Sequence, residues 1–163
     1  MVVNKCPPTI LIDTREKQPF EFAWAVSHKQ IAGIEVGKVD AGDYTILDIP
    51  NLVTVERKKT VGEIYNNLVP KDKYERFVRE LERMQKFEHR YIVVEQYWED
   101  LWNRDNFKFA RRNKQWAGSM VLSHLIALET DYNVHIHFAG EYAEQLTLKL
   151  LVKQYERAMR KAS

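Results

Sequence analysis

The sequence predicts an α/β domain in which helices flank a mixed β-sheet. Short apolar runs of strand length alternate along the chain with longer stretches that carry apolar residues at helical spacing, and this order is typical of layered α/β domains. The chain has 163 residues, enough for one compact core, and contains no internal repeat, low-complexity tract or Gly/Ser linker. We therefore expect residues 1–163 to form a single domain.

Four strands are expected in the N-terminal part of the chain. The first is a short apolar run that ends on Asp13, and the second alternates with the strand period. A tight bend at Ala41-Gly42-Asp43 leads into the third. The third and fourth are joined by residues 48–51, which are rich in turn formers, so these strands should pair as a hairpin. The expected strands are 9–13, 34–39, 44–47 and 52–58.

Helices dominate the rest of the chain, with two further strands between them. Thr60 is a suitable N-cap, and Glu63, three residues later, is its capping-box partner. Pro70 ends this short helix, and the next segment is amphipathic. Helices are expected at 60–68, 72–87, 117–130 and 141–161, and strands at 91–95 and 134–138.

The composition is that of an ordinary globular protein, with 45% hydrophobic and 29% charged residues. No apolar run approaches the roughly 18 residues that a membrane helix needs, and the N-terminus lacks the features of a signal peptide. The single Cys6 cannot form an internal disulfide. We expect an intracellular location, in the cytoplasm or nucleoid, and no membrane partner.

Residues 104–114 carry five positive charges against a single Asp105, although the whole chain has a net charge of only +2. Clustered bases with interspersed aromatic residues suit a phosphate backbone, so DNA is an expected partner. A solvated, charged loop is the alternative for this segment. The five basic residues are Arg104, Lys108, Arg111, Arg112 and Lys114.

The expected hairpin brings charged residues together at one end. With a four-residue loop at 48–51, facing residues have numbers that sum to 99, which places Asp43 opposite Glu56. Lys58 shares the face of Glu56, because strand side chains alternate with a period of two. The opposite face receives an apolar set suited to packing under helices: Tyr44, Ile46, Val53 and Val55.

Two carboxylates and an ammonium in one place suit phosphodiester hydrolysis. Neighbouring carboxylates repel one another and favour a hard divalent cation such as Mg²⁺ or Mn²⁺, which lowers the pKa of a bound water and neutralises charge growing on the phosphate. An adjacent lysine can orient the attacking water or stabilise the transition state. The alternative is a surface Glu-Arg-Lys run with an unrelated aspartate thirteen residues earlier.

Three strings stand out: Ile12-Asp13-Thr14-Arg15-Glu16, Ala41-Gly42-Asp43-Tyr44 and Val55-Glu56-Arg57-Lys58. Together they resemble the nuclease domain of the XPF family of structure-specific endonucleases. The helix and strand around 76–95 and the segment 119–139 extend the resemblance, which covers most of residues 9–152. It implies a restriction-endonuclease-like fold and an enzyme that cleaves DNA at branches, flaps or junctions, in recombination or repair.

The resemblance also implies roles for individual residues. Asp43 and Glu56 would be metal ligands, with the backbone carbonyl of Arg57 as a third. Lys58 would position the water or stabilise charge. In support would stand Asp13 as a further metal ligand, Glu16 to complete the acidic cluster, and Arg15 against a phosphate or the carboxylates.

Two departures from the family pattern bear on these roles. The family's final aspartate falls six residues after the glutamate, where this chain has Gly62. Glu63 would substitute if Lys59 is an insertion, in which case Lys59 competes with Lys58 for its role or contacts DNA. No helix-hairpin-helix module is expected, so specificity would come from the domain itself, from a homodimer paired through the last two helices, or from a partner subunit.

Histidines, tryptophans and the cysteine offer weaker candidates. His135 and His137 would face one side of a strand, but no third ligand follows at zinc spacing. Trp98 and Trp102 lie four residues apart on an expected short helix, which favours packing against the core over stacking on bases. Cys6 has no adjacent histidine to activate it.

Three functions remain after this reading of the sequence. A metal-dependent endonuclease is the first. The second is a catalytically inactive relative that binds DNA or pairs with an active partner, because Gly62 departs from the motif. The third is a regulatory binding protein with an incidental acidic pocket. The chain has no Gly-rich phosphate-binding motif, which argues against a nucleotide-driven motor.

Overall fold

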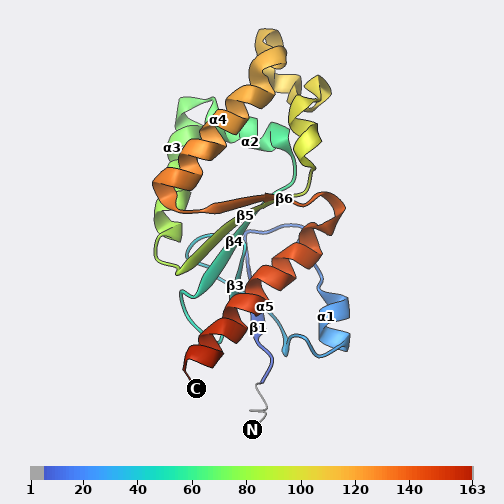
Figure 1. The fold of residues 1–163 in the computed structure, drawn as a ribbon, viewed down its shortest axis with the longest axis vertical. Coiled ribbons are helices and arrows are strands. Elements are labelled where there is room, and N and C mark those ends of the chain that lie inside the picture. The colour runs from blue at the N-terminus through green and yellow to red at the C-terminus, as the bar shows by residue number, and fades with distance from the viewer. Residues whose placement is uncertain (1–5, 163) are drawn as a thin grey trace.

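The computed structural model describes residues 6–162, apart from the side chain of Arg112. Its centre is a six-stranded mixed sheet in the order β2-β1-β3-β4-β5-β6 (Figure 1). β1 pairs parallel with β2 and antiparallel with β3, the hairpin β3–β4 is antiparallel, and β4, β5 and β6 run parallel. The strands are β1 (Thr9–Asp13), β2 (Gly33–Gly37), β3 (Tyr44–Ile46), β4 (Val53–Lys58), β5 (His89–Val94) and β6 (His135–Phe138).

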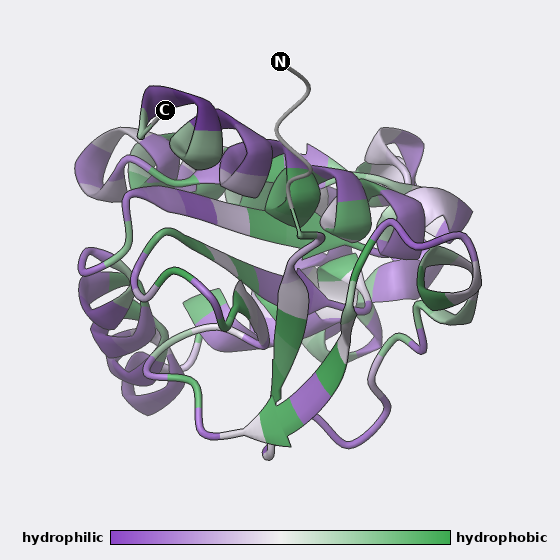
Figure 2. Cartoon of the chain, turned by 90° about the horizontal axis from the view of Figure 1, so that it is seen from below, coloured by the Kyte–Doolittle hydropathy of each residue, from purple (hydrophilic) through white to green (hydrophobic). Residues whose placement is uncertain are grey.

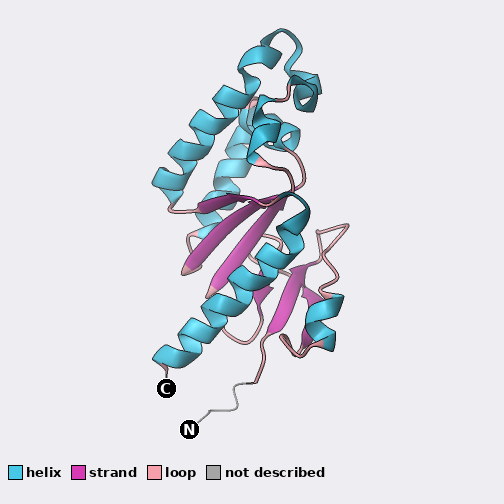
Figure 3. Cartoon of the chain, turned by 45° about the vertical axis from the view of Figure 1, so that its right-hand side comes forward, coloured by secondary structure: helices cyan, strands magenta, loops and turns pink. Residues whose placement is uncertain are grey.

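Helices cover both faces of the sheet (Figure 3). α2, α3, α4 and the 3-10 segments η1 and η2 share one buried cluster, whereas α1 and α5 pack into a second cluster on the other face. In the described part of the chain, no helix is both long and apolar enough to cross a membrane. The helical elements are α1 (Ala23–Ser27), α2 (Val61–Leu68), α3 (Lys71–Met84), η1 (Trp98–Trp102), η2 (Arg104–Asn113), α4 (Lys114–Tyr132), η3 (Gly140–Tyr142) and α5 (Ala143–Lys161).

Alternation along the strands accounts for this two-sided packing. Val55 belongs to the cluster beneath α5, whereas Ile92 and Val94 belong to the cluster beneath α2, α3 and α4. Figure 2 shows hydrophobic residues concentrated on the strands and the inner sides of the helices, with hydrophilic residues outside. The expected apolar face of the hairpin is confirmed, since all four of its members are buried: Tyr44, Ile46, Val53 and Val55.

All of the expected helices and strands exist, most of them with shifted ends. The largest shifts are at α4, which begins three residues before 117 and continues to Tyr132, and at α3, which ends at Met84 instead of 87. The helix expected from 141 begins at Ala143, after the 3-10 turn η3. Residues 104–113 of the basic segment, for which a solvated loop was the alternative to DNA binding, form η2, Lys114 begins α4, and α1 was not expected.

The η2 segment is packed against the domain although its sequence is strongly charged. Phe107 and Ala110 are buried, and the ring of Phe107 lies edge-on to Tyr65 of α2. The chain approaches α2 so closely that a Cβ atom on Gly62 would overlap the carbonyl oxygen of Asn106. Glycine at position 62 is therefore what allows η2 to lie against the start of α2.

Candidate active site

The hairpin register places Asp43 beside Glu56. Tyr44 pairs with Val55 across β3 and β4, as the four-residue loop predicted. Immediately before β3, the N–H of Asp43 donates to the carbonyl of Val55 at 2.8 Å, and Oδ2 of Asp43 accepts the N–H of Arg57 at 2.8 Å. These two bonds fix the carboxyl of Asp43 at the end of β4, next to the Glu56 side chain.

The surroundings of Asp43 disfavour a second negative charge. Burial and the neighbouring Glu56 carboxylate raise the pKa of Asp43 to about 8, and Glu16 acts in the same direction. The hydrogen bond from Arg57 N–H and the charge of Lys58 oppose this shift only in part. A carboxyl with so high a pKa is stabilised as an anion by any added positive charge, which is the electrostatic condition for a cation site.

Lys58 lies buried beside the two acids. Its Nζ donates to Oε1 of Glu56 at 2.7 Å and lies 3.8 Å from Oε1 of Glu63. Burial lowers the pKa of this ammonium, but the charges of Glu56, Glu63 and Asp43 outweigh burial and leave the pKa above its ordinary value. Lys58 is therefore a fixed positive charge at neutral pH.

A pocket of about 830 Å³ opens over these residues. Lys58 is buried and the carboxylates are half-buried, whereas Lys73, Arg76 and Lys108 on the same pocket are exposed. A second hollow of about 360 Å³ lies next to it, and both are lined by Asp43 and Glu56. The residues that line both hollows are Arg15, Asp43, Glu56 and Glu63.

Asp13 lies behind the pocket and is not among the residues that line it. Its carboxylate accepts two bonds from the Arg15 side chain, at 2.7 and 3.0 Å, and one from the N–H of Val39 at 2.8 Å. Burial disfavours its charge, but these bonds outweigh burial and hold the pKa of Asp13 below its ordinary value. The carboxylate of Asp13 thus orients Arg15, which does line the pocket.

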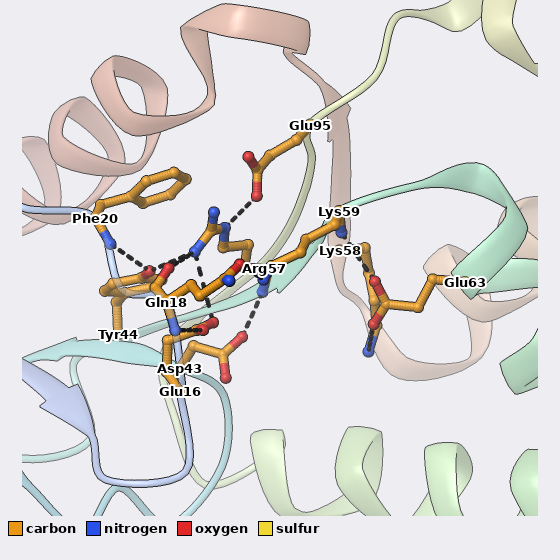
Figure 4. Close-up of polar contacts among 10 residues, drawn as sticks. All are labelled: Glu16, Gln18, Phe20, Asp43, Tyr44, Arg57, Lys58, Lys59, Glu63 and Glu95. Atoms are coloured by element: carbon orange, nitrogen blue, oxygen red, sulfur yellow. Dashed lines mark hydrogen bonds and ion pairs between the residues drawn. The ribbon is translucent and has the colours of Figure 1, made fainter.

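The side chain of Arg57 points away from Lys58 (Figure 4). Its guanidinium lies 4.0 Å from the centre of the Phe20 ring, pairs with Glu95 and donates to the carbonyl of Gln18. Glu16 lies 3.7 Å from the same guanidinium. Successive strand residues alternate in direction, so Arg57 faces the segment 16–20 while its neighbours Glu56 and Lys58 face the pocket.

Lys59 and Glu63 lie at the mouth of the site. Nζ of the exposed Lys59 donates to Oε1 of Gln18 at 2.6 Å, and its N–H donates to Oε2 of Glu63 at 3.0 Å. Thr60 caps α2 by accepting the N–H of Glu63, as expected, but the Glu63 carboxylate returns to Lys59 instead of completing a capping box with Thr60. The acid nearest to Lys58 on α2 is therefore Glu63, one residue after the Gly62 position where the family has its aspartate.

A family model decides the classification of the chain. The model described as the ERCC4 domain matches residues 12–148. This range includes all three motif strings, 12–16, 41–44 and 55–58. The chain belongs to the ERCC4 domain family. Its resemblance to the XPF family is thereby confirmed.

Solved structures confirm the restriction-endonuclease-like fold. This ERCC4 domain is similar to XPF from Aeropyrum pernix, with a TM-score of 0.62 and 17% identity over 91% of this chain and 61% of that chain. XPF from Aeropyrum pernix in complex with DNA gives a TM-score of 0.62 and 18% identity, over 93% of this chain and 66% of that chain. The chain thus spans about two-thirds or less of the XPF chains it matches. A search of curated proteins finds no match.

The acidic pair of this ERCC4 domain suits a magnesium-type cation. Within the described residues, no group of three or more histidine, cysteine or acidic side chains is arranged to hold a metal ion. Mg²⁺ is, however, commonly bound through one or two carboxylates together with substrate phosphates and water. Asp43 and Glu56 supply such a pair, and the raised pKa of Asp43 marks it as short of positive charge.

Glu80 is a pocket residue that the sequence analysis missed. It lies on α3, and its Oε1 accepts the N–H of Gly42 at 2.8 Å, beside Asp43. The periodicity of α3 identified its buried apolar side but gave no sign that Glu80 would reach the bend before β3. That contact depends on how α3 crosses the sheet.

The weaker candidates have mixed outcomes. Trp98 and Trp102 form the expected short helical turn, but the expected packing against the core is wrong, since they are 46% and 53% exposed. The ring of Trp98 lies nearly perpendicular to the rings of Trp102 and Phe138. His135 and His137 share one side of β6, against Tyr91.

The expected DNA-binding residues lie in different places. Lys108 lines the pocket, whereas Arg104, Arg111 and Lys114 are exposed but are not among the residues that line it. The side chain of Arg112 lies outside the described residues.

Proposed function

We propose that this chain is a metal-dependent DNA endonuclease that hydrolyses phosphodiester bonds with Asp43, Glu56 and Lys58. The observation that carries the proposal is the convergence of two half-buried carboxylates and a buried ammonium in one open pocket. Membership of the ERCC4 domain family supports a nuclease, and the similar XPF from Aeropyrum pernix has a structure in complex with DNA. Exposed cations around the pocket suit the phosphates of a DNA strand.

Asp43 and Glu56 would hold a Mg²⁺ or Mn²⁺ ion. Such an ion supplies a bound water of lowered pKa and positive charge against the phosphate. Asp13 is a weaker candidate ligand than the other two, because Arg15 and the N–H of Val39 already occupy its carboxylate. In this proposal Asp13 keeps Arg15 aimed at the pocket, where its guanidinium can contact a phosphate.

Lys58 would act as an ammonium and not as a neutral base. Its pKa is raised by the surrounding carboxylates, so it keeps its proton at neutral pH. A buried positive charge beside the reacting phosphate stabilises the negative charge that grows on the phosphoryl oxygens. Glu63, 3.8 Å from Lys58, would help to hold that ammonium in place.

The proposed substrate is DNA with a branch, a flap or a single-strand/duplex junction, in recombination or repair. The direct test incubates the purified protein with labelled duplex, single-stranded, flap and four-way-junction DNA, in Mg²⁺, Mn²⁺ or EDTA. Glu56→Gln removes one carboxylate charge with little change in size, and Glu35→Gln makes the same change at an exposed position on β2.

We expect metal-dependent cutting that falls by more than about 100-fold in Glu56→Gln and is unchanged in Glu35→Gln. Binding without cutting under every metal would instead favour the second candidate, an inactive DNA-binding relative or partner subunit. Gly62 is the observation that favours this second candidate, because it stands where the family motif has an acid. Cutting that survives in both Glu56→Gln and Asp43→Asn would refute the site.

A further inference from the structure

We propose that Phe109 stacks on an unpaired base and so selects DNA that has an unstacked nucleotide beside the cleaved phosphate. This inference rests on the proposed function. Phe109 is 73% exposed, the most exposed of the large hydrophobic residues described, and it lines the same pocket as Asp43, Glu56 and Lys58. An aromatic face at the outer edge of a phosphate-binding pocket is suited to a nucleobase.

The position of Phe109 is set by its neighbours in η2. Phe107 and Ala110 are buried in the core beneath α2 and α4, and the Asn106 carbonyl rests against Gly62. The backbone leaves helical geometry at Phe107 and at Arg111, where φ is +42°. Phe109 lies between the buried residues Phe107 and Ala110, so its exposed ring belongs to a segment that is held on both sides.

The Phe109 ring has a free face. It makes no contact with another ring within the described residues, whereas Phe20 stacks on Tyr44 and Phe107 lies edge-on to Tyr65. Inside duplex DNA each base face is covered by its neighbours, so only an unpaired or terminal base can offer its face to a protein ring. The exposed ring therefore favours a strand that has left the duplex near the active site.

Free cations accompany the ring. Lys73 and Arg76 of α3 and Lys108 of η2 line the pocket, and none of them forms an ion pair with a described residue. Among the acids of the pocket, Glu56 and Glu63 pair with Lys58 and Glu80 pairs with Arg83, whereas Asp105 forms no ion pair with a described residue. Unpaired cations beside an exposed ring match the two parts of a nucleotide, a phosphate and a base.

The test measures binding and stacking without cutting. Fluorescence anisotropy in EDTA compares a single-stranded oligo(dT), a blunt duplex and a duplex with a single-stranded overhang. The variants are Phe109→Ala, Phe109→Trp and the control Trp24→Ala, because Trp24 is also an exposed aromatic but belongs to α1 on the opposite face of the sheet. An overhang that contains 2-aminopurine reports the stacking of that base through the change in its fluorescence on binding.

We expect Phe109→Ala to weaken binding of the single strand and the overhang by roughly tenfold, with little effect on the blunt duplex. It should also abolish the change in 2-aminopurine fluorescence on binding, and Phe109→Trp should restore the tighter binding. Equal weakening on all three DNAs, or none, would overturn the proposal. So would a change in oligomeric state of Phe109→Ala in analytical ultracentrifugation, since Phe109 would then cover a protein interface.

Cleavage is measured separately on the overhang substrate with Mg²⁺. Stacking through Phe109 in a protein that cuts no DNA would refute the proposed endonuclease and leave this inference intact. Cutting that depends on Glu56 while Phe109→Ala binds and cuts every DNA like the unchanged protein would refute the inference and leave the endonuclease intact.

Discussion

Nζ of Lys58 donates a hydrogen bond of 2.7 Å to Oε1 of Glu56, and both side chains are largely buried. The pair is formed within one strand, by residues two apart, so it needs no other element to align it. A positive charge is thereby held beside the Glu56 carboxylate, inside the pocket and largely shielded from solvent.

The first prediction separates the two adjacent lysines. Lys58→Met should reduce cleavage by more than about 100-fold, because the buried positive charge in the pocket is lost. Lys59→Met should reduce it by less than about tenfold, because Lys59 is exposed and donates to Gln18 at the rim. Single-turnover cleavage measures both, and a larger effect at Lys59 would show that the motif is shifted by one residue.

The second prediction concerns the pH dependence of folding in the absence of metal. The pKa of Asp43 rises from 3.8 to about 8 on folding, so between these values the folded protein keeps a proton that the unfolded chain releases. The free energy of unfolding should therefore fall as pH rises from about 4 to about 8. Asp43→Asn cannot release that proton and should be more stable than the unchanged protein at pH 8.

Thermal unfolding in EDTA across this pH range measures the effect, with about 2–4 °C expected for each kcal/mol recovered. Glu35→Gln is the matched control, since Glu35 is exposed on β2. A pH profile of Asp43→Asn that runs parallel to that of the unchanged protein would contradict the raised pKa.

The third prediction concerns Gly62. A methyl group there would overlap the carbonyl oxygen of Asn106, so Gly62→Ala must push η2 away from α2. We expect a loss of about 1–3 kcal/mol in the free energy of unfolding. Restoring the family's acid with Gly62→Asp should be at least as destabilising and should not raise cleavage. Gly33→Ala is the control, because a Cβ atom at Gly33 meets no atom within 4 Å; equal stability of the two variants would argue against the close contact.

The fourth prediction concerns the side chain of Arg57, a residue that we expected among the catalytic ones and whose backbone carbonyl the family resemblance gives as a third metal ligand. Arg57→Lys keeps the charge but loses the planar contacts with Phe20, Glu95 and the Gln18 carbonyl. We expect about 2 kcal/mol of destabilisation and faster proteolysis of the segment 16–20. Cleavage at a temperature where the variant is folded should fall by less than about tenfold. A loss of cleavage as large as that of Lys58→Met, with unchanged stability, would show that the Arg57 side chain acts directly on the reacting phosphate.

The centre of the site was predictable because it depends on local rules. A four-residue loop fixes the hairpin register, which the pairing of Tyr44 with Val55 confirms. The strand period of two then places Lys58 on the same face as Glu56, and the two side chains are in contact. The acid at the end of β1 was also recognised. Arg15 was expected against a phosphate or the carboxylates, and its guanidinium pairs with the Asp13 carboxylate.

Contacts between distant elements were beyond the sequence. Glu80 reaches Gly42 only because α3 crosses the sheet at a particular place, and the Asn106 carbonyl lies against Gly62 only because η2 folds under α2. The burial of Phe107 within a charged stretch had no counterpart in any helix or strand pattern. Such contacts are set by packing in three dimensions, so a single sequence leaves them undetermined.

The carboxylates of Asp43 and Glu56 line two adjoining hollows. A closed pocket admits a polymer only by its terminus. Two open hollows that share lining residues let a strand enter through one and leave through the other. In the proposed endonuclease the reacting phosphate then needs no chain end within reach. A covalently closed circle of single-stranded DNA should be cut as readily as a linear strand, with a single first product of full length.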